Sequence, residues 1–293
     1  MSDISQKMRD VAKKLLQDGT VSLVIGWEKG NLWYKSAPAF ISLPEDADRL
    51  VFDDFCYHNL SKYLIDRRDM DGKITIFVKG CDSRSLIGMI QDKQIAREKL
   101  YIIGIPCPGM KEDKAAVGKK PGADLPEAKK CALCVNPNPL IYDELIGEKA
   151  PDREKKNDEI LEKVEAMSQD EKYEFWQEQF STCIRCYACR NVCPVCTCRE
   201  CCFDSSAPQW LGKAENPSEN SFYHLTRALH MAGRCVGCGE CERVCPMGLP
   251  VMLLNRKLTK EVESLFNESP AGTVMEDMAA MNHYRLDDPE EFM

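Results

Sequence analysis

Two runs of cysteines in the second half of the chain have the side-chain type and the spacing needed to hold iron. In each run, two residues separate the first three cysteines from one another, a fourth cysteine follows after three more residues, and a proline comes next. The runs occupy residues 183–194 (CIRCYACRNVCP) and 235–246 (CVGCGECERVCP). This is the spacing of thiolates that bind [4Fe–4S] clusters. The sequence therefore predicts two such clusters.

The last cysteine of each run is expected to bind the cluster of the other run. A CxxCxxC loop wraps around one side of a cubane, so the fourth thiolate must come from elsewhere, and in two-cluster ferredoxins it crosses over. The predicted ligands of one cluster are Cys183, Cys186, Cys189 and Cys245. Those of the other are Cys235, Cys238, Cys241 and Cys193. Zinc sites also use CxxC pairs, but two complete runs that each end in Cys-Pro favour iron–sulfur clusters.

A strand–helix–strand unit is predicted in the first half of the chain. Residues 74–78 (ITIFV) and 100–105 (LYIIGI) have the β-branched and apolar composition of buried strands, and residues 80–95 between them are expected to be helical. Strands joined in this way are parallel. The fold class predicted for this half is therefore α/β.

Three further local elements are expected. Residues 21–26 and 31–35 should form a hairpin, and residues 59–68 should form a helix. Ser168 followed by Glu171 predicts a capping box at the start of another helix.

Four further cysteines are expected to meet at one edge of that sheet. Cys81 and Cys107 follow the two strands, so both should lie at the carboxyl edge, where open α/β sheets bind ligands. Cys131 and Cys134 form a third CxxC pair. Together they make up the four ligands of a third [4Fe–4S] cluster. The alternative is that only the CxxC pair is functional and the strand-end cysteines are buried as small apolar residues.

Composition bounds the class of protein. A chain of 293 residues suits two domains, and its net charge of −8 argues against a general nucleic-acid binder. Seventeen cysteines without an N-terminal signal peptide indicate a reducing compartment, and we expect an anaerobic cytoplasm. No run reaches the ~18 apolar residues of a membrane span, so a soluble protein is expected.

The order of these motifs resembles a known family. The Gly80–Cys81 pair after a strand, the strand ending in IGIPC (103–107) and CALCVNPNPLIYDELIG (131–147) are similar to the β-subunit family of coenzyme F420-reducing hydrogenases. The cysteine-rich half resembles the related β-subunit of F420-linked formate dehydrogenases. The resemblance implies an electron-transfer subunit in which an FAD domain precedes a 2×[4Fe–4S] ferredoxin domain. If FAD binds, we expect it along Lys79, Gly80 and Arg84, at the start of a helix.

We predict four parts along the chain. These are an α/β flavin and cluster domain (1–148), a charged linker (149–178), a mainly α-helical dicluster ferredoxin-like domain (179–260) and an acidic C-terminal tail (261–293). The tail is either disordered or docks on a partner subunit. Within the third part, an apolar helical stripe is predicted to frame the clusters: Phe222, Leu225, Ala228 and Leu229.

Two groups of residues near the runs have open roles. Cys196, Cys198, Cys201 and Cys202 either hold an additional cluster or zinc, or one of them replaces Cys193 as crossing ligand. His224 and His230 are expected to lie close enough to hydrogen-bond a cluster sulfur and tune its potential.

Two functional classes fit these patterns. The first is an iron–sulfur subunit of a multi-subunit anaerobic oxidoreductase that passes electrons between a flavin and the clusters. Its partners would be a hydrogenase, a formate dehydrogenase, a heterodisulfide-reductase-like (HdrA-like) or electron-bifurcating flavoprotein, or soluble ferredoxin. The second is a self-contained flavin-dependent reductase of a small substrate or of F420. The first is favoured because no acid, base or nucleophile constellation stands out.

Overall fold

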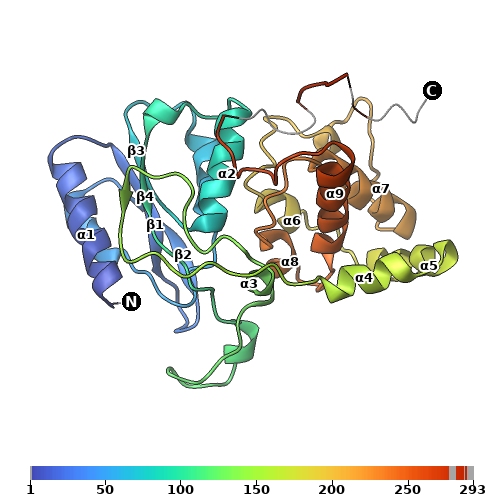
Figure 1. Ribbon diagram of the computed structural model, residues 1–293, viewed down its shortest axis with the longest axis horizontal. Coiled ribbons are helices and arrows are strands. Elements are labelled where there is room, and N and C mark those ends of the chain that lie inside the picture. Colours follow the sequence, from blue (N-terminus) through green and yellow to red (C-terminus); the bar gives the residue numbers. More distant parts are fainter. Residues whose placement is uncertain (1, 277–281, 287, 289–293) are drawn as a thin grey trace. The chain divides into compact units, whose positions relative to one another are not determined.

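The computed structural model describes residues 2–276, 282–286 and 288. The chain divides into two compact units, Met1–Lys155 and Lys156–Met293, coloured blue to green and yellow to red in Figure 1. The finer division into four parts remains a prediction, and residues 277–281, 287 and 289–293 of the predicted acidic tail lie outside the described residues.

A mixed five-stranded sheet forms the centre of the first unit, with strand order β2-β1-β3-β4-β5. Its strands are β1 (Leu23–Lys29), β2 (Ser36–Ile41), β3 (Ile74–Val78), β4 (Leu100–Gly104) and β5 (Glu144–Leu145). β1 and β2 are antiparallel, whereas β1 with β3, β3 with β4, and β4 with β5 pair in parallel. Helix α2 (Gly80–Gln91) follows β3 and precedes β4. The α/β class predicted for this half is confirmed.

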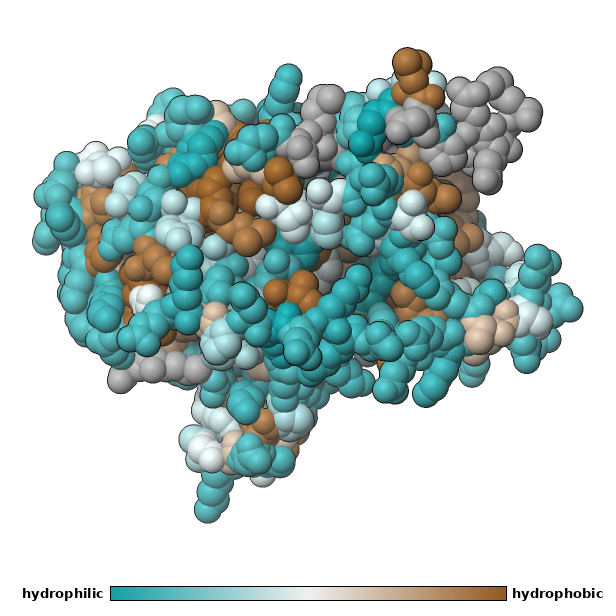
Figure 2. Space-filling model, in the orientation of Figure 1, coloured by the Kyte–Doolittle hydropathy of each residue, from teal (hydrophilic) through white to brown (hydrophobic). Residues whose placement is uncertain are grey.

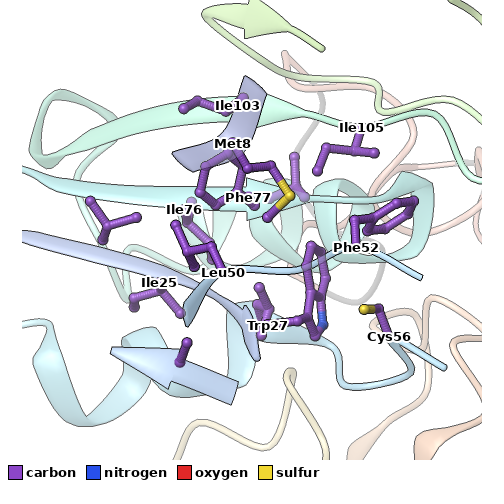
Figure 3. Close-up of a cluster of buried hydrophobic side chains, with 14 of the residues drawn as sticks. Met8, Ile25, Trp27, Leu50, Phe52, Cys56, Ile76, Phe77, Ile103 and Ile105 are labelled. Carbon is purple, nitrogen blue, oxygen red and sulfur yellow. The ribbon is translucent and has the colours of Figure 1, made fainter. Parts of the chain in front are cut away.

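The core of this unit lies on the sheet. All five residues of β3 are buried, as the continuous apolar run ITIFV requires. Helix α1 (Ser2–Gln17) presents Met8, Ala12 and Leu15 to this core, at the spacing of one helical face. Figure 3 shows Met8 beside Phe77 and Leu50.

Three local expectations in this unit are corrected. The second hairpin strand is residues 36–41 rather than 31–35, because residues 30–35 form a turn closed by Gly30 N–H donating to Lys35 O. The helix expected over 59–68 is a 3₁₀-helix, Leu60–Arg67. The helix expected to reach residue 95 ends at Gln91, because Lys93 adopts a φ of 53°.

Helices make up the second unit. They are α4 (Glu159–Ala166), α5 (Gln169–Ser181), α6 (Ala188–Asn191), α7 (Pro217–His230), α8 (Glu240–Arg243) and α9 (Val251–Leu265). All strands in the described part of the chain belong to the first unit. The capping box predicted at α5 is confirmed, since Ser168 Oγ accepts from Glu171 N–H and Glu171 Oε2 accepts from Ser168 N–H. Helix α7 packs against α5 and α9.

The remaining short elements are α3 (Lys129–Ala132) and the 3₁₀-helices Pro44–Arg49, Arg97–Lys99, Lys114–Ala116 and Cys202–Asp204. On the face drawn in Figure 2, hydrophilic side chains predominate and apolar ones form separate patches. Among the described helices, none combines the length and apolarity needed to cross a bilayer.

Candidate iron–sulfur sites

The two cysteine runs of the second unit share one backbone conformation. The residues on either side of the middle cysteine of each CxxCxxC loop have positive φ: Arg185 (44°) and Tyr187 (57°) in the first run, and Gly237 (69°) and Gly239 (70°) in the second. Short helices α6 and α8 begin immediately afterwards. Glycine adopts this conformation without a steric cost, whereas other residues are held in it at a cost of about 1–3 kcal/mol. The first run therefore has the same loop conformation as the second, but its non-glycine residues adopt it at a cost in backbone strain.

Side-chain contacts offset that strain. Arg185 Nη1 donates to Glu219 Oε2 at 2.7 Å, and its Nη2 donates to Ala214 O. The Tyr187 ring meets Tyr223 edge to face, with centroids 5.2 Å apart. The insertion between the runs thus holds the first loop in shape.

Site I is the predicted ligand set Cys183, Cys186, Cys189 and Cys245. All four line one partly open hollow, together with Tyr223 and His224. Burial raises the pKa of Cys183, and the proximity of Cys189 and Cys245 raises it further. Backbone N–H groups point at two of the sulfurs: Arg185 N lies 3.4 Å from Cys183 Sγ, and Leu249 N lies 3.4 Å from Cys245 Sγ.

Site II is the predicted set Cys193, Cys235, Cys238 and Cys241. Burial raises the pKa of Cys238 well above its ordinary value, and Cys193 is the thiol that adds most to this rise. The pKa of Cys241 is likewise raised by burial, and Cys193 and Cys235 both add to it. Cys193 therefore lies beside the second run, as the crossing arrangement requires.

The four additional cysteines gather next to site II. Burial raises the pKa of Cys196 to about 11, and Cys193, Cys198 and Cys201 act in the same direction. Cys202 interacts with Cys201 and Cys198 in the same way. Within residues 2–276, 282–286 and 288, no three His, Cys, Asp or Glu side chains are arranged around a position for a single metal ion. A [4Fe–4S] cluster does not require such an arrangement, because its four thiolates bind four separate irons and not one central ion.

The buried cation Arg227 shows whether the surroundings of sites I and II fit an anionic cluster. Arg227 is 3% exposed, and its Nε has no hydrogen-bond partner in the described structure. Its described partners include no carboxylate: Nη2 donates to Cys189 O at 3.1 Å, and the charge faces Cys241 and Cys193. An unpaired buried charge is costly. Thiolates that hold anionic clusters would supply the missing negative charge, so the surroundings fit bound clusters.

The buried face of α7 differs from the one that the sequence predicted. Phe222, Leu225 and Leu229 are 42%, 48% and 62% exposed, so the predicted apolar stripe does not frame the clusters. The residues of this helix that face the cysteine runs are instead polar: Asn220, Tyr223, His224 and Arg227. Of these, only His224 was singled out from the sequence. His224 lies 3.2 Å from Cys183 Sγ, whereas His230 is exposed. The sequence signal that could have identified this buried face is the recurrence of these polar residues at the spacing of one helical face.

Site III is the predicted set Cys81, Cys107, Cys131 and Cys134 in the first unit. Burial raises the pKa of Cys107 to about 11, and Cys131 and Cys134 act in the same direction. Cys134 also contributes to the raised pKa of Cys81. The strand-end cysteines and the CxxC pair therefore come together. Cys131 Sγ additionally accepts from Met110 N–H at 3.5 Å.

The segment proposed for flavin, Lys79 to Arg84, begins with a buried cation. Lys79 is 1% exposed, and its Nζ lies 2.9 Å from Asp82 Oδ2 and 3.9 Å from the centroid of the Trp27 ring. Burial works to lower the pKa of Lys79, but Asp82 and Cys81 together raise it above its ordinary value. Arg84 is half-buried. Flavin binding at Lys79, Gly80 and Arg84 remains a prediction, and Arg84 is the most accessible cation of the segment.

Replacing Lys79 by methionine is expected to lower the free energy of unfolding by about 3–5 kcal/mol, because Asp82 is left as an unpaired buried carboxylate. Lys13→Met removes an exposed ion pair with Asp48 and should change the free energy of unfolding far less. Anaerobic urea denaturation followed by circular dichroism measures both. Equal decreases in the free energy of unfolding of the two variants would show that the buried ion pair stabilises the fold no more than the exposed one does.

Comparisons with known proteins agree with the iron–sulfur geometry. Residues 179–249 match the family model of the 4Fe-4S dicluster domain. The F420-dependent formate dehydrogenase subunit beta of Methanocaldococcus jannaschii is 23% identical over 88% of this chain and 89% of its own length. The F420-dependent formate dehydrogenase 1 subunit beta of Methanococcus maripaludis is 28% identical over 88% of both chains.

A solved structure of the F420-reducing [NiFe] hydrogenase complex from Methanosarcina barkeri also matches. It shares 16% identity at a TM-score of 0.32 and covers 40% of this chain and 44% of that chain. The relatives and the dicluster domain together confirm what the motifs indicated: this chain resembles, over most of its length, the β subunits of F420-dependent formate dehydrogenases, and carries a [4Fe–4S] dicluster domain in its second half.

Proposed function

We propose that the chain is the electron-transfer subunit of a multi-subunit anaerobic oxidoreductase, with [4Fe–4S] clusters in sites I, II and III. In this proposal the first unit uses its strand–helix–strand edge to hold one cluster and to contact FAD near Arg84. The mainly α-helical domain holds the other two. The observation that carries the proposal is Arg227, a buried cation whose described partners include no carboxylate and whose charge anionic clusters at the cysteine runs would balance.

When bound, the clusters supply one-electron carriers, and a flavin exchanges a two-electron hydride for single electrons. The residues of the chain bind, orient and shield these groups. The positive-φ loops would present three thiolates of each run to its cluster, and the buried side chains Phe180, Tyr223 and Leu249 exclude water around site I.

The partners proposed for the chain follow from its relatives, which are formate dehydrogenase subunits. A formate dehydrogenase, a hydrogenase or an HdrA-like flavoprotein would supply or accept the electrons, with soluble ferredoxin as a mobile alternative. A reducing cytoplasm would keep the seventeen cysteines available for iron.

Metal and flavin content of anaerobically purified protein tests the proposal. We expect about twelve irons, an equal amount of sulfide and one FAD per chain, since each cubane contains four irons. A Cys131→Ser/Cys134→Ser double variant should retain about eight irons. Cys56→Ser is the matched control, because Cys56 is buried beside Asp53 and belongs to none of the sites.

Other outcomes would contradict distinct parts of the proposal. About eight irons in the wild-type chain would reject a cluster at site III. Stoichiometric zinc in place of iron would reject the electron-transfer role altogether. Reduction of F420 or of a small substrate by the isolated chain would favour the self-contained reductase instead.

A further inference from the structure

Helix α7 directs a polar face at sites I and II. Its residues Asn220, Tyr223, His224 and Arg227 follow the spacing of one helical face and are all buried. The large apolar residues of the same helix, Phe222, Leu225 and Leu229, are exposed instead. Burying polar side chains in place of apolar ones costs free energy unless they find partners. The partners of this face are the cysteine runs themselves.

Two of these side chains reach sulfurs of site I. His224 Nε2 lies 3.2 Å from Cys183 Sγ, and the hydroxyl of Tyr223 lies 3.5 Å from Cys189 Sγ. The His224 ring stacks on Phe180 with centroids 5.1 Å apart, which fixes its orientation. Asn220 Nδ2 donates to Phe180 O and Cys183 O at 2.9 Å each, which fixes the start of the first run against the helix.

Arg227, one turn further along, acts on both sites. Its Nη2 donates to Cys189 O, and its charge faces Cys241 first, then Cys193 and Cys189. Two of these three cysteines belong to site II. The electrostatic effect of Arg227 is therefore shared between the two sites.

We propose that α7 sets the reduction potentials of the two clusters separately, through sulfur contacts from His224 and Tyr223 at site I and through the charge of Arg227 at both sites. This inference rests on the proposed function, because it requires clusters at these sites. One electron adds a negative charge to a cluster, so hydrogen bonds to its sulfurs and nearby cations favour the reduced form. Because the insertion between the runs supplies this helix, it tunes the electron path through the second unit.

Redox titration of the full chain, followed by electron paramagnetic resonance, tests the inference. Ligand variants Cys186→Ser and Cys238→Ser first assign one signal to each site. His224→Leu and Tyr223→Phe should each lower the equilibrium constant for one-electron reduction of the site I cluster about tenfold. This corresponds to a reduction potential that is lower by ~59 mV, and the potential of site II should not change. Arg227→Met should lower both potentials.

Two controls separate tuning from structural damage. His224→Gln restores an N–H donor and should keep most of the wild-type potential, and His230→Leu changes an exposed histidine of the same helix and should shift neither site. Tyr223→Phe removes a single oxygen, so a variant with full iron content and an unshifted site I would overturn the inference. Equal shifts at both sites in His224→Leu would overturn it as well. Absence of both cluster signals from the wild-type chain would instead overturn the proposed function.

Discussion

Replacing Cys193 by serine is expected to remove the cluster of site II and to spare that of site I, although Cys193 belongs to the run that builds site I. The reason is its position beside Cys238 and Cys241. The variant should lose about four of about twelve irons, since one cubane contains four. Its paramagnetic resonance spectrum should lack the signal that Cys238→Ser also removes.

Cys245→Ser gives the reciprocal test and should remove the site I signal instead. Cys196→Ser is the matched control, because Cys196 lies close to Cys193 but outside both sites, and it should retain both clusters. Loss of the site II cluster in Cys196→Ser with retention in Cys193→Ser would show that an additional cysteine is the crossing ligand. Loss of site I in Cys193→Ser would show that each run completes its own cluster.

Gly80→Ala is expected to abolish iron binding at site III and to lower the free energy of unfolding by about 3 kcal/mol. A Cβ at this position would lie 1.9 Å from Asn136 O and 2.9 Å from its carbonyl carbon. Both are backbone atoms, so the segment after Cys134 must move away from the start of α2. That movement separates Cys134 from Cys81, and about four irons should be lost.

Gly118→Ala controls for the substitution itself. Gly118 has a φ of 75° and no atom within 4 Å of the added Cβ, so only the backbone conformation is strained, at about 1 kcal/mol. Iron analysis and anaerobic urea denaturation of both variants measure the difference. If Gly80→Ala kept twelve irons and wild-type stability, close approach of the Asn136 segment would not be needed for site III.

The sequence alone determined the features that depend on short stretches of chain. The CxxCxxCxxxCP spacing is local, and so are the buried run of β3 and the capping box at Ser168 and Glu171. The β3–α2–β4 order predicted that Cys81 and Cys107 end up at one edge, because parallel strands present the same ends together. These features follow from composition and period, which no distant contact has to supply.

Tertiary structure decided which face of an element is buried and which cation is paired. Strand β2 begins at Ser36 because residues 30–35 close a turn and Trp33 donates to Lys119 O, a partner far along the chain. Helix α7 has apolar and polar stripes of similar length, so its own sequence favours burial of the apolar one. The cysteine runs reverse this choice, because their sulfurs and carbonyls lie next to polar groups of His224, Tyr223 and Arg227. The charge of Lys79 is likewise fixed by Asp82 and Trp27 in the fold, which is why a residue predicted to meet a flavin is found facing the core.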